Sequence, residues 1–226
     1  MTEAVENRVI FVGGPWPKGH AIKEFAWSAR LDPKTGIWFH LHLTSDDYSA
    51  EDNEGDADPE GDVANWNSKI VWNNYHACTI SSVEWDHSGF LVATRESPLD
   101  MKALTGRELV VDPPPFDIDR DAAFGVYLQG HDTVAGHQIM FSRTAPAADW
   151  TVDWRGIIAL TYLGGDEFRR KFVARKTGAT FEGVELPADA KPDQTLDQLA
   201  PFVKDIKSYS LDKSPEGELR AKYKIR

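Results

Sequence analysis

The chain has 226 residues, of which 41% are hydrophobic and 27% charged, a composition typical of a globular protein. Its formal net charge of −11 argues against a nucleic-acid partner, because phosphate binding needs a basic surface. No apolar run reaches the roughly 18 to 20 residues of a membrane span, which argues against a membrane protein. The single cysteine, Cys78, excludes an intramolecular disulfide and zinc sites with several thiolates.

The first residues lack the pattern of a secretory signal, so we expect a cytoplasmic protein. Its expected partner is a small-molecule ligand. The oligomeric state is left open, and a homodimer is compatible with the sequence. The whole chain, 1–226, is expected to form one β domain. An acidic loop at 45–67 and a C-terminal helix plus strand at 195–226 are its expected additions.

The best hairpin joins residues 23–31 to residues 37–44. Both segments alternate apolar and polar side chains, as half-buried strands do. The intervening DPKTG, residues 32–36, is a turn sequence in which Gly36 accepts a left-handed conformation. In the second strand the odd-numbered residues are apolar, whereas Trp38, His40 and His42 occupy the other face.

Further alternating segments follow. We predict a second hairpin from 75–85 and 90–95, and a third from 124–129 and 137–143. Four more strands are expected at 150–163, 168–176, 180–186 and 217–226, the last at a sheet edge.

Two short helices are expected at 97–106 and 195–207, with Pro201 kinking or splitting the second. About ten strands with two helices predict an all-β protein, either a calycin-like antiparallel barrel or a two-sheet sandwich.

His40 and His42 lie two residues apart on a strand and could therefore reach one metal ion. A third ligand would come from His76, His131 or His137. Cupins carry a similar His-x-His pair followed by a glutamate, where this chain has Asp46 or Asp47. The glycine spacing differs, however, and the second cupin motif is not matched. The cofactor is left open: the sequence is compatible with none, and a transition metal is the minority hypothesis.

Nine acids and no Lys or Arg lie between residues 46 and 62. Asp56, Asp58 and Glu60 resemble the start of a calcium-binding loop. Asn67 stands where a bidentate Glu would be required, so a solvated loop is the preferred interpretation.

Eight tryptophans in one chain suggest either large core residues or the walls of a ligand pocket. We place Trp38, His40, His42, Trp85 and Tyr127 in the expected ligand site.

Glu84 and His76 are the candidates for acid/base chemistry. Both are expected on one face of the 75–85 strand, where an inward-facing carboxylate would have a raised pKa.

The hairpin KEFAWSARLDPKTGIWFHLHL, residues 23–43, resembles an element of the lipocalin-like proteins related to hydroxyneurosporene synthase, the AttH/CrtC type. The resemblance covers less than a tenth of the chain. It implies a barrel cavity for an apolar small molecule, with cofactor-independent chemistry or simple binding.

The main hypothesis is therefore binding of a small, largely apolar molecule in an aromatic-lined barrel cavity, with or without acid/base chemistry. A metal-dependent, cupin-like enzyme using His40 and His42 is one alternative. A carbohydrate-binding module with exposed, coplanar tryptophans is the other. The sequence does not decide whether the protein is an enzyme.

Overall fold

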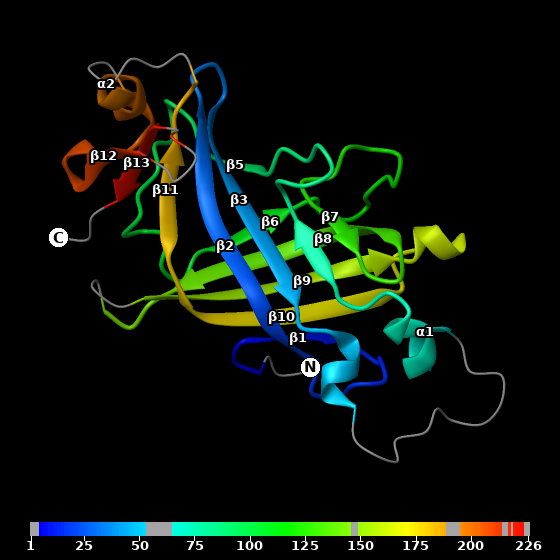
Figure 1. The fold of residues 1–226 in the computed structure, drawn as a ribbon. Coiled ribbons are helices and arrows are strands. Elements are labelled where there is room, and N and C mark those ends of the chain that lie inside the picture. Colours follow the sequence, from blue (N-terminus) through cyan, green and yellow to red (C-terminus); the bar gives the residue numbers. More distant parts are fainter. Residues whose placement is uncertain are drawn as a thin grey trace.

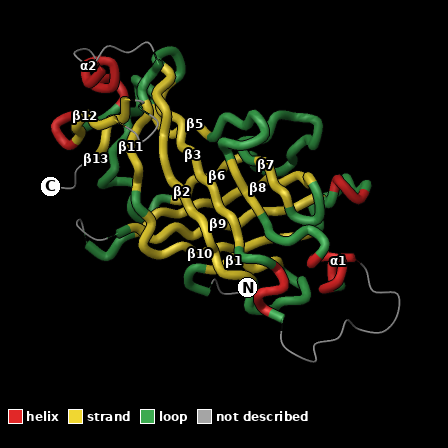
Figure 2. Tube along the Cα trace, in the orientation of Figure 1, coloured by secondary structure: helices red, strands yellow, loops and turns green. Residues whose placement is uncertain are grey.

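The structure, a computed structural model, describes residues 5–52, 65–145, 149–188, 195–213, 217 and 219–223. Within these residues the chain is all-β, with thirteen strands and two short α-helices. The helices are α1 (Lys69–Asn73) and α2 (Thr195–Leu199), and both lie at the periphery of the strands (Figure 2). No helix in this part of the chain is both long and apolar enough to cross a membrane.

Eight antiparallel strands close into a barrel (Figure 1). They follow one another around it in the order β1, β2, β3, β4, β7, β8, β9 and β10, and β10 pairs with β1 again. Their bounds are β1 Arg8–Phe11, β2 His20–Asp32, β3 Gly36–Ser45, β4 Thr79–Ser81, β7 Gly125–Tyr127, β8 His131–Ser142, β9 Trp150–Ala159 and β10 Arg170–Ala179. The barrel prediction is confirmed, and the sandwich alternative is excluded.

Five further strands extend the sheet. β5 (Phe90–Ala93) pairs with β3, and β6 (Glu108–Val111) pairs with β8. β11 (Phe181–Glu185) runs parallel to β2, followed by β13 (Leu219–Tyr223) and then β12 (Tyr209–Lys213). The last predicted strand is thus flanked on both sides, and the prediction of an edge position was wrong.

The predicted first hairpin is confirmed as β2 and β3. In its turn the Asp32 carboxylate accepts the Lys34 N–H at 2.8 Å, and the Asp32 carbonyl accepts the Thr35 N–H at 3.2 Å. Gly36 has φ +139°, and a Cβ there would lie 1.9 Å from the Ala93 carbonyl oxygen. Glycine is therefore required by both conformation and space.

The predicted second hairpin was wrong. β4 and β5 do not pair with each other, because both lie antiparallel to β3, β4 beside its second half and β5 beside its first. The strand predicted at 75–85 shrinks to Thr79–Ser81. His76 and Trp85, near the two ends of the predicted strand, have positive φ. The Ser81 hydroxyl accepts the N–H groups of Val83 and Glu84, which the prediction had placed in the strand.

The helix predicted at 97–106 was also wrong. The Leu99 N–H donates to the Phe202 carbonyl, and the Leu99 carbonyl accepts the Lys204 N–H, so this backbone is used in a β-bridge. The Asp100 carboxylate then holds an isolated turn. Of the helix predicted at 195–207, only α2 is α-helical. It ends before Pro201, as expected, and two short 3-10 turns, Ala200–Phe202 and Ile206–Ser208, follow it.

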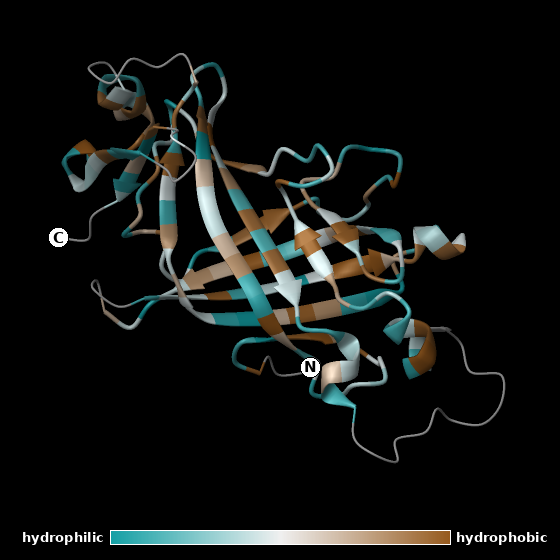
Figure 3. Cartoon of the chain, in the orientation of Figure 1, coloured by the Kyte–Doolittle hydropathy of each residue, from teal (hydrophilic) through white to brown (hydrophobic). Residues whose placement is uncertain are grey.

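The long strands each have one buried and one more exposed face. Figure 3 shows hydrophilic and hydrophobic residues alternating along β2 and β3. In β3 the four odd-numbered apolar side chains, Ile37 to Leu43, are completely buried in the main hydrophobic core. Large rings fill that core, and Trp27 packs 4.4 Å from Phe141 and 5.5 Å from Phe39, measured between ring centroids. The even-numbered residues of β3 therefore face away from the barrel interior.

Candidate functional site

Two of the eight tryptophans are not buried, and both line the same pocket. The six at positions 16, 27, 66, 72, 150 and 154 are at most 6% exposed. Trp38 is half-buried and Trp85 is 40% exposed. The pocket that they share has a volume of about 520 Å³, which is within the range of small-molecule sites.

The pocket lies between two strand edges. Among the described strands, β5 pairs only with β3 and β6 only with β8, so each has an unpaired edge. Phe90 and Leu91 of β5 and Val111 of β6 all line the pocket. The segments 85–89 and 120–123 complete its walls. The pocket thus lies between two strands that extend the sheet beyond the closed barrel.

The backbone around the pocket is unusual. Three of its lining residues, Trp85, Asp86 and Asp112, have φ between +49° and +64°. Such conformations are costly for residues other than glycine and cluster at functional sites. Gly125 lies beneath, where a Cβ would come within 2.5 Å of both the Trp85 ring and His87 Nε2. These two rings therefore pack directly on the β7 backbone.

His87 lines the pocket, and a hydrogen bond to the backbone fixes its ring. Its Nδ1 lies 2.8 Å from the Ala122 carbonyl oxygen, which can only accept a hydrogen bond. When the ring is neutral, Nδ1 therefore carries the proton and Nε2 presents a lone pair. The Nε2 edge of the ring lies against the Gly125 backbone of β7, where a Cβ would come within 2.5 Å of it.

Two further polar groups line the pocket. The Asp112 carboxylate accepts the Ala123 N–H at 2.8 Å, and burial raises the pKa of this carboxyl above its ordinary value. Arg120 is exposed, and within the described ranges no carboxylate lies at ion-pairing distance from it. Asp86 and Asp121 also line the pocket, so it combines aromatic faces with groups of both charges.

The predicted pair His40 and His42 lies on the outer face of β3, where His42 contacts Ser81 at the end of β4 and His40 contacts the next residue, Ser82. His40 is buried, its Nδ1 contacts the Ser82 carbonyl at 3.2 Å, and burial lowers its pKa. Both ring nitrogens of His42 have partners, Ser81 Oγ and Thr44 Oγ1, each at 3.1 Å. Neither histidine forms part of the pocket lining.

The predicted acid/base pair is not brought together. Glu84 lies in the turn after β4, 43% exposed, with its carboxylate 3.7 Å from His42 Nδ1. The His76 side chain is 80% exposed in a different turn and lies 3.6 Å from Asp47. The two residues share no strand face, because β4 begins after His76 and ends before Glu84.

Tyr127 and Trp85 are connected through His131. The centroid of the His131 ring lies 5.2 Å from that of Trp85 and 5.3 Å from that of Tyr127. Of these three residues, Trp85 lines the pocket, and Tyr127 and His131 do not.

In the described ranges no three His, Cys, Asp or Glu side chains are grouped as a metal ion would require. Of the third ligands considered, His137 is completely buried in the core and accepts the Trp154 indole N–H at 3.1 Å. Asp56, Asp58 and Glu60, whose spacing resembles a calcium-binding loop, lie outside the described residues.

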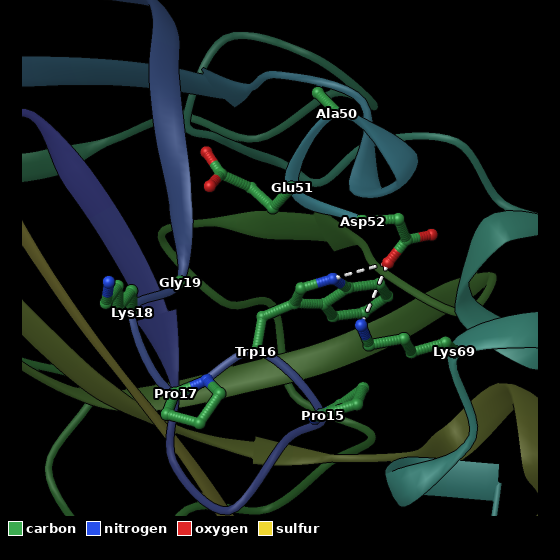
Figure 4. Close-up of a pocket in the computed structure, with 9 residues that line it drawn as sticks. All are labelled: Pro15, Trp16, Pro17, Lys18, Gly19, Ala50, Glu51, Asp52 and Lys69. Carbon is green, nitrogen blue, oxygen red and sulfur yellow. Dashed lines mark hydrogen bonds and ion pairs between the residues drawn. The ribbon is translucent and has the colours of Figure 1, made fainter. Parts of the chain in front are cut away.

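A second pocket of about 520 Å³ lies at the β1–β2 connection (Figure 4). Its two carboxylates are already engaged. Glu51 pairs with Arg8 at 2.7 Å, and Asp52 accepts the Trp16 indole N–H at 3.0 Å and lies 3.1 Å from Lys69 Nζ. Both carboxylates at this pocket are therefore already paired within the protein.

Comparison of the chain with protein-family models, with curated proteins and with solved structures gives no match. The resemblance of residues 23–43 to the lipocalin-like family therefore stays a prediction. The aromatic-rich barrel is compatible with small-molecule binding.

Of the residues that line this pocket, Trp38 and Trp85 were predicted from the sequence as ligand-site residues, and His87, Asp112 and Arg120 were not. The DHSG turn at 86–89 and the loop after β6 hold all three, and their turn-like composition gave no indication that they meet.

Proposed function

We propose that the protein binds a small, ring-containing molecule in the pocket between β5 and β6. The apolar face of the ring packs against Trp38 and Trp85, and its polar edge meets His87, Asp112 and Arg120. One observation carries the proposal: the two tryptophans that the fold leaves partly exposed line the same pocket. Exposed indole faces are costly in water and are typical of ligand walls.

The surroundings of Trp38 support a binding role. Its indole N–H donates to Thr35 Oγ1 at 2.9 Å, and the Arg30 guanidinium carbon lies 5.3 Å from the ring centroid. Contacts of this kind hold a side chain in one orientation before a ligand arrives. Pre-organisation lowers the entropic cost of binding.

Saturation-transfer NMR with single-ring and fused-ring compounds, neutral monosaccharides included, tests the proposal. We expect ring compounds to bind and to quench tryptophan emission. Trp38→Ala and Trp85→Ala should each weaken binding about tenfold, the effect of losing roughly 1.4 kcal/mol of ring contact.

Tyr162→Ala is the matched control, because Tyr162 is an aromatic residue, 60% exposed, outside the pocket lining. Unchanged affinity in both tryptophan variants, or no bound ring compound at all, would refute the proposal. Binding confined to monosaccharides would instead support the carbohydrate-binding alternative.

A further inference from the structure

A second surface, separate from the proposed site, has the properties of a ligand groove. It lies on the outer face of β8, β9, β10 and the end of β1 and has a volume of about 560 Å³. Val12, Ile157 and Val173 provide apolar walls, and Gln138, Arg155 and Lys171 provide polar ones. We call this surface the β9–β10 groove.

The strand register explains the arrangement. Arg155 of β9 lies opposite Val173 of β10, and Ile157 lies opposite Lys171. All four side chains point outward, because they alternate with Gly156 and with the buried Phe172. The two cations therefore occupy diagonal corners, with apolar side chains at the other two.

A β-bulge makes the hollow. The register of β8 against β9 shifts between Ala135 and Gln138, and Gly136 within this shift has φ +59°. A Cβ at Gly136 would lie 3.0 Å from the Ile157 side chain. The missing side chain thus leaves the Ile157 surface open.

The charge of the groove differs from that of the chain. None of its lining residues is acidic, although the chain carries a net charge of −11. Arg155 also reaches outside the groove, where its Nη2 lies 3.0 Å from Glu108 Oε1. Lys171 is exposed, and within the described ranges no carboxylate pairs with it. An anionic head group is therefore the complementary partner.

We propose that the β9–β10 groove binds a single amphiphilic carboxylate, with its head group at Lys171 and Arg155 and its hydrocarbon chain over Ile157, Val173 and Val12. The volume of about 560 Å³ is within the range of sites that hold one small molecule.

Isothermal titration calorimetry of the full chain with monomeric dodecanoate tests the proposal. Dodecanoate should bind about tenfold more tightly than dodecanol, because only the carboxylate forms charge-assisted hydrogen bonds. Dodecyltrimethylammonium should not bind. From octanoate to dodecanoate, affinity should rise by up to about fourfold per added methylene.

Lys171→Gln combined with Arg155→Gln should weaken dodecanoate binding about tenfold or more. Lys34→Gln combined with Arg107→Gln removes the same charge at exposed positions outside the groove and should leave affinity unchanged. Trp38→Ala should also have no effect, which separates this groove from the pocket between β5 and β6.

Equal affinities for dodecanoate and dodecanol, or undiminished binding by the Lys171 and Arg155 double variant, would overturn the proposal. Tighter association with phosphatidylglycerol vesicles than with monomeric dodecanoate would overturn it in favour of a membrane surface. Absence of dodecanoate binding to the folded wild-type protein would also refute it.

Discussion

Two histidines in the protein interior show how single residues depend on their surroundings. His20 packs among the rings of Trp16 and Tyr48, and His137 lies beside Phe124 and Trp154. Burial lowers the pKa of His20 to about 4 and that of His137 to about 3. Both rings are therefore neutral in the folded protein at pH 5, whereas in the unfolded chain they take up protons below about pH 6.5.

This difference predicts acid sensitivity. As the pH falls from 7 to 5, only the unfolded state gains these protons, so each histidine lowers the free energy of unfolding by about 2 kcal/mol. In His137→Gln, which keeps an acceptor for the Trp154 N–H, the loss between pH 7 and 5 should be smaller by about that amount. Urea unfolding at both pH values measures it, with exposed His76→Gln as the control. An unchanged loss in His137→Gln would contradict the argument.

Gly125 is the residue on which the geometry of the proposed pocket depends. A Cβ at this position would collide with the rings of Trp85 and His87. Gly125→Ala should therefore destabilise the protein by about 1–3 kcal/mol and displace both rings from the pocket. Thermal unfolding and ligand titration check the two effects. Gly106→Ala makes no new contact within 4 Å but has positive φ, so it should lower stability without affecting binding.

At the scale of elements, the segment between β4 and β5 decides where Trp85 lies. β4 stops at Ser81, whose hydroxyl accepts the N–H groups of Val83 and Glu84 at 3.2 Å each. The chain then crosses from one half of β3 to the other and places Trp85 and His87 over β7. One buried hydroxyl thus holds a turn that a continuous strand would otherwise replace.

Ser81→Ala removes this acceptor and leaves two backbone N–H groups without it. We expect a loss of about 1–3 kcal/mol in the free energy of unfolding and weaker ligand binding through the displaced Trp85. Chemical denaturation and titration with a ring compound measure both. Ser210→Ala, in β12 and outside the pocket lining, is the comparison. Full affinity in Ser81→Ala would show that the turn does not position the site.

At the scale of the molecule, the closed barrel places its large rings inside and leaves few at the surface. Six tryptophans are buried, and they lie between residues 16 and 154 of the chain. Acrylamide should therefore quench only the emission of Trp38 and Trp85 efficiently. The double variant Trp38→Phe and Trp85→Phe should abolish most of the quenchable fraction. If a large fraction of the emission stayed quenchable in this double variant, the six core tryptophans would be more accessible to acrylamide than their burial in the structure indicates.

Period-two alternation and turn residues in the sequence determined the all-β class, the β2–β3 hairpin and the division of β3 into two faces. These features are local, because neighbouring side chains on a strand point in opposite directions and Asp32 and Gly36 shape their own turn. The same pattern identified Trp38 as a residue outside the core. Alternation does not encode which strand lies beside which.

Only the tertiary structure decided the strand order and the composition of the site. β4 and β5 both pair with β3 because a ten-residue strand offers room for two short partners, a choice made by contacts far apart in sequence. Asp112 and Arg120 follow β6 in the chain. They line the same pocket as the two tryptophans because β6 pairs with β8, again a contact between segments far apart in sequence. Trp38, His40 and His42 face outward because the barrel closes over the odd-numbered side chains, which are the more apolar set.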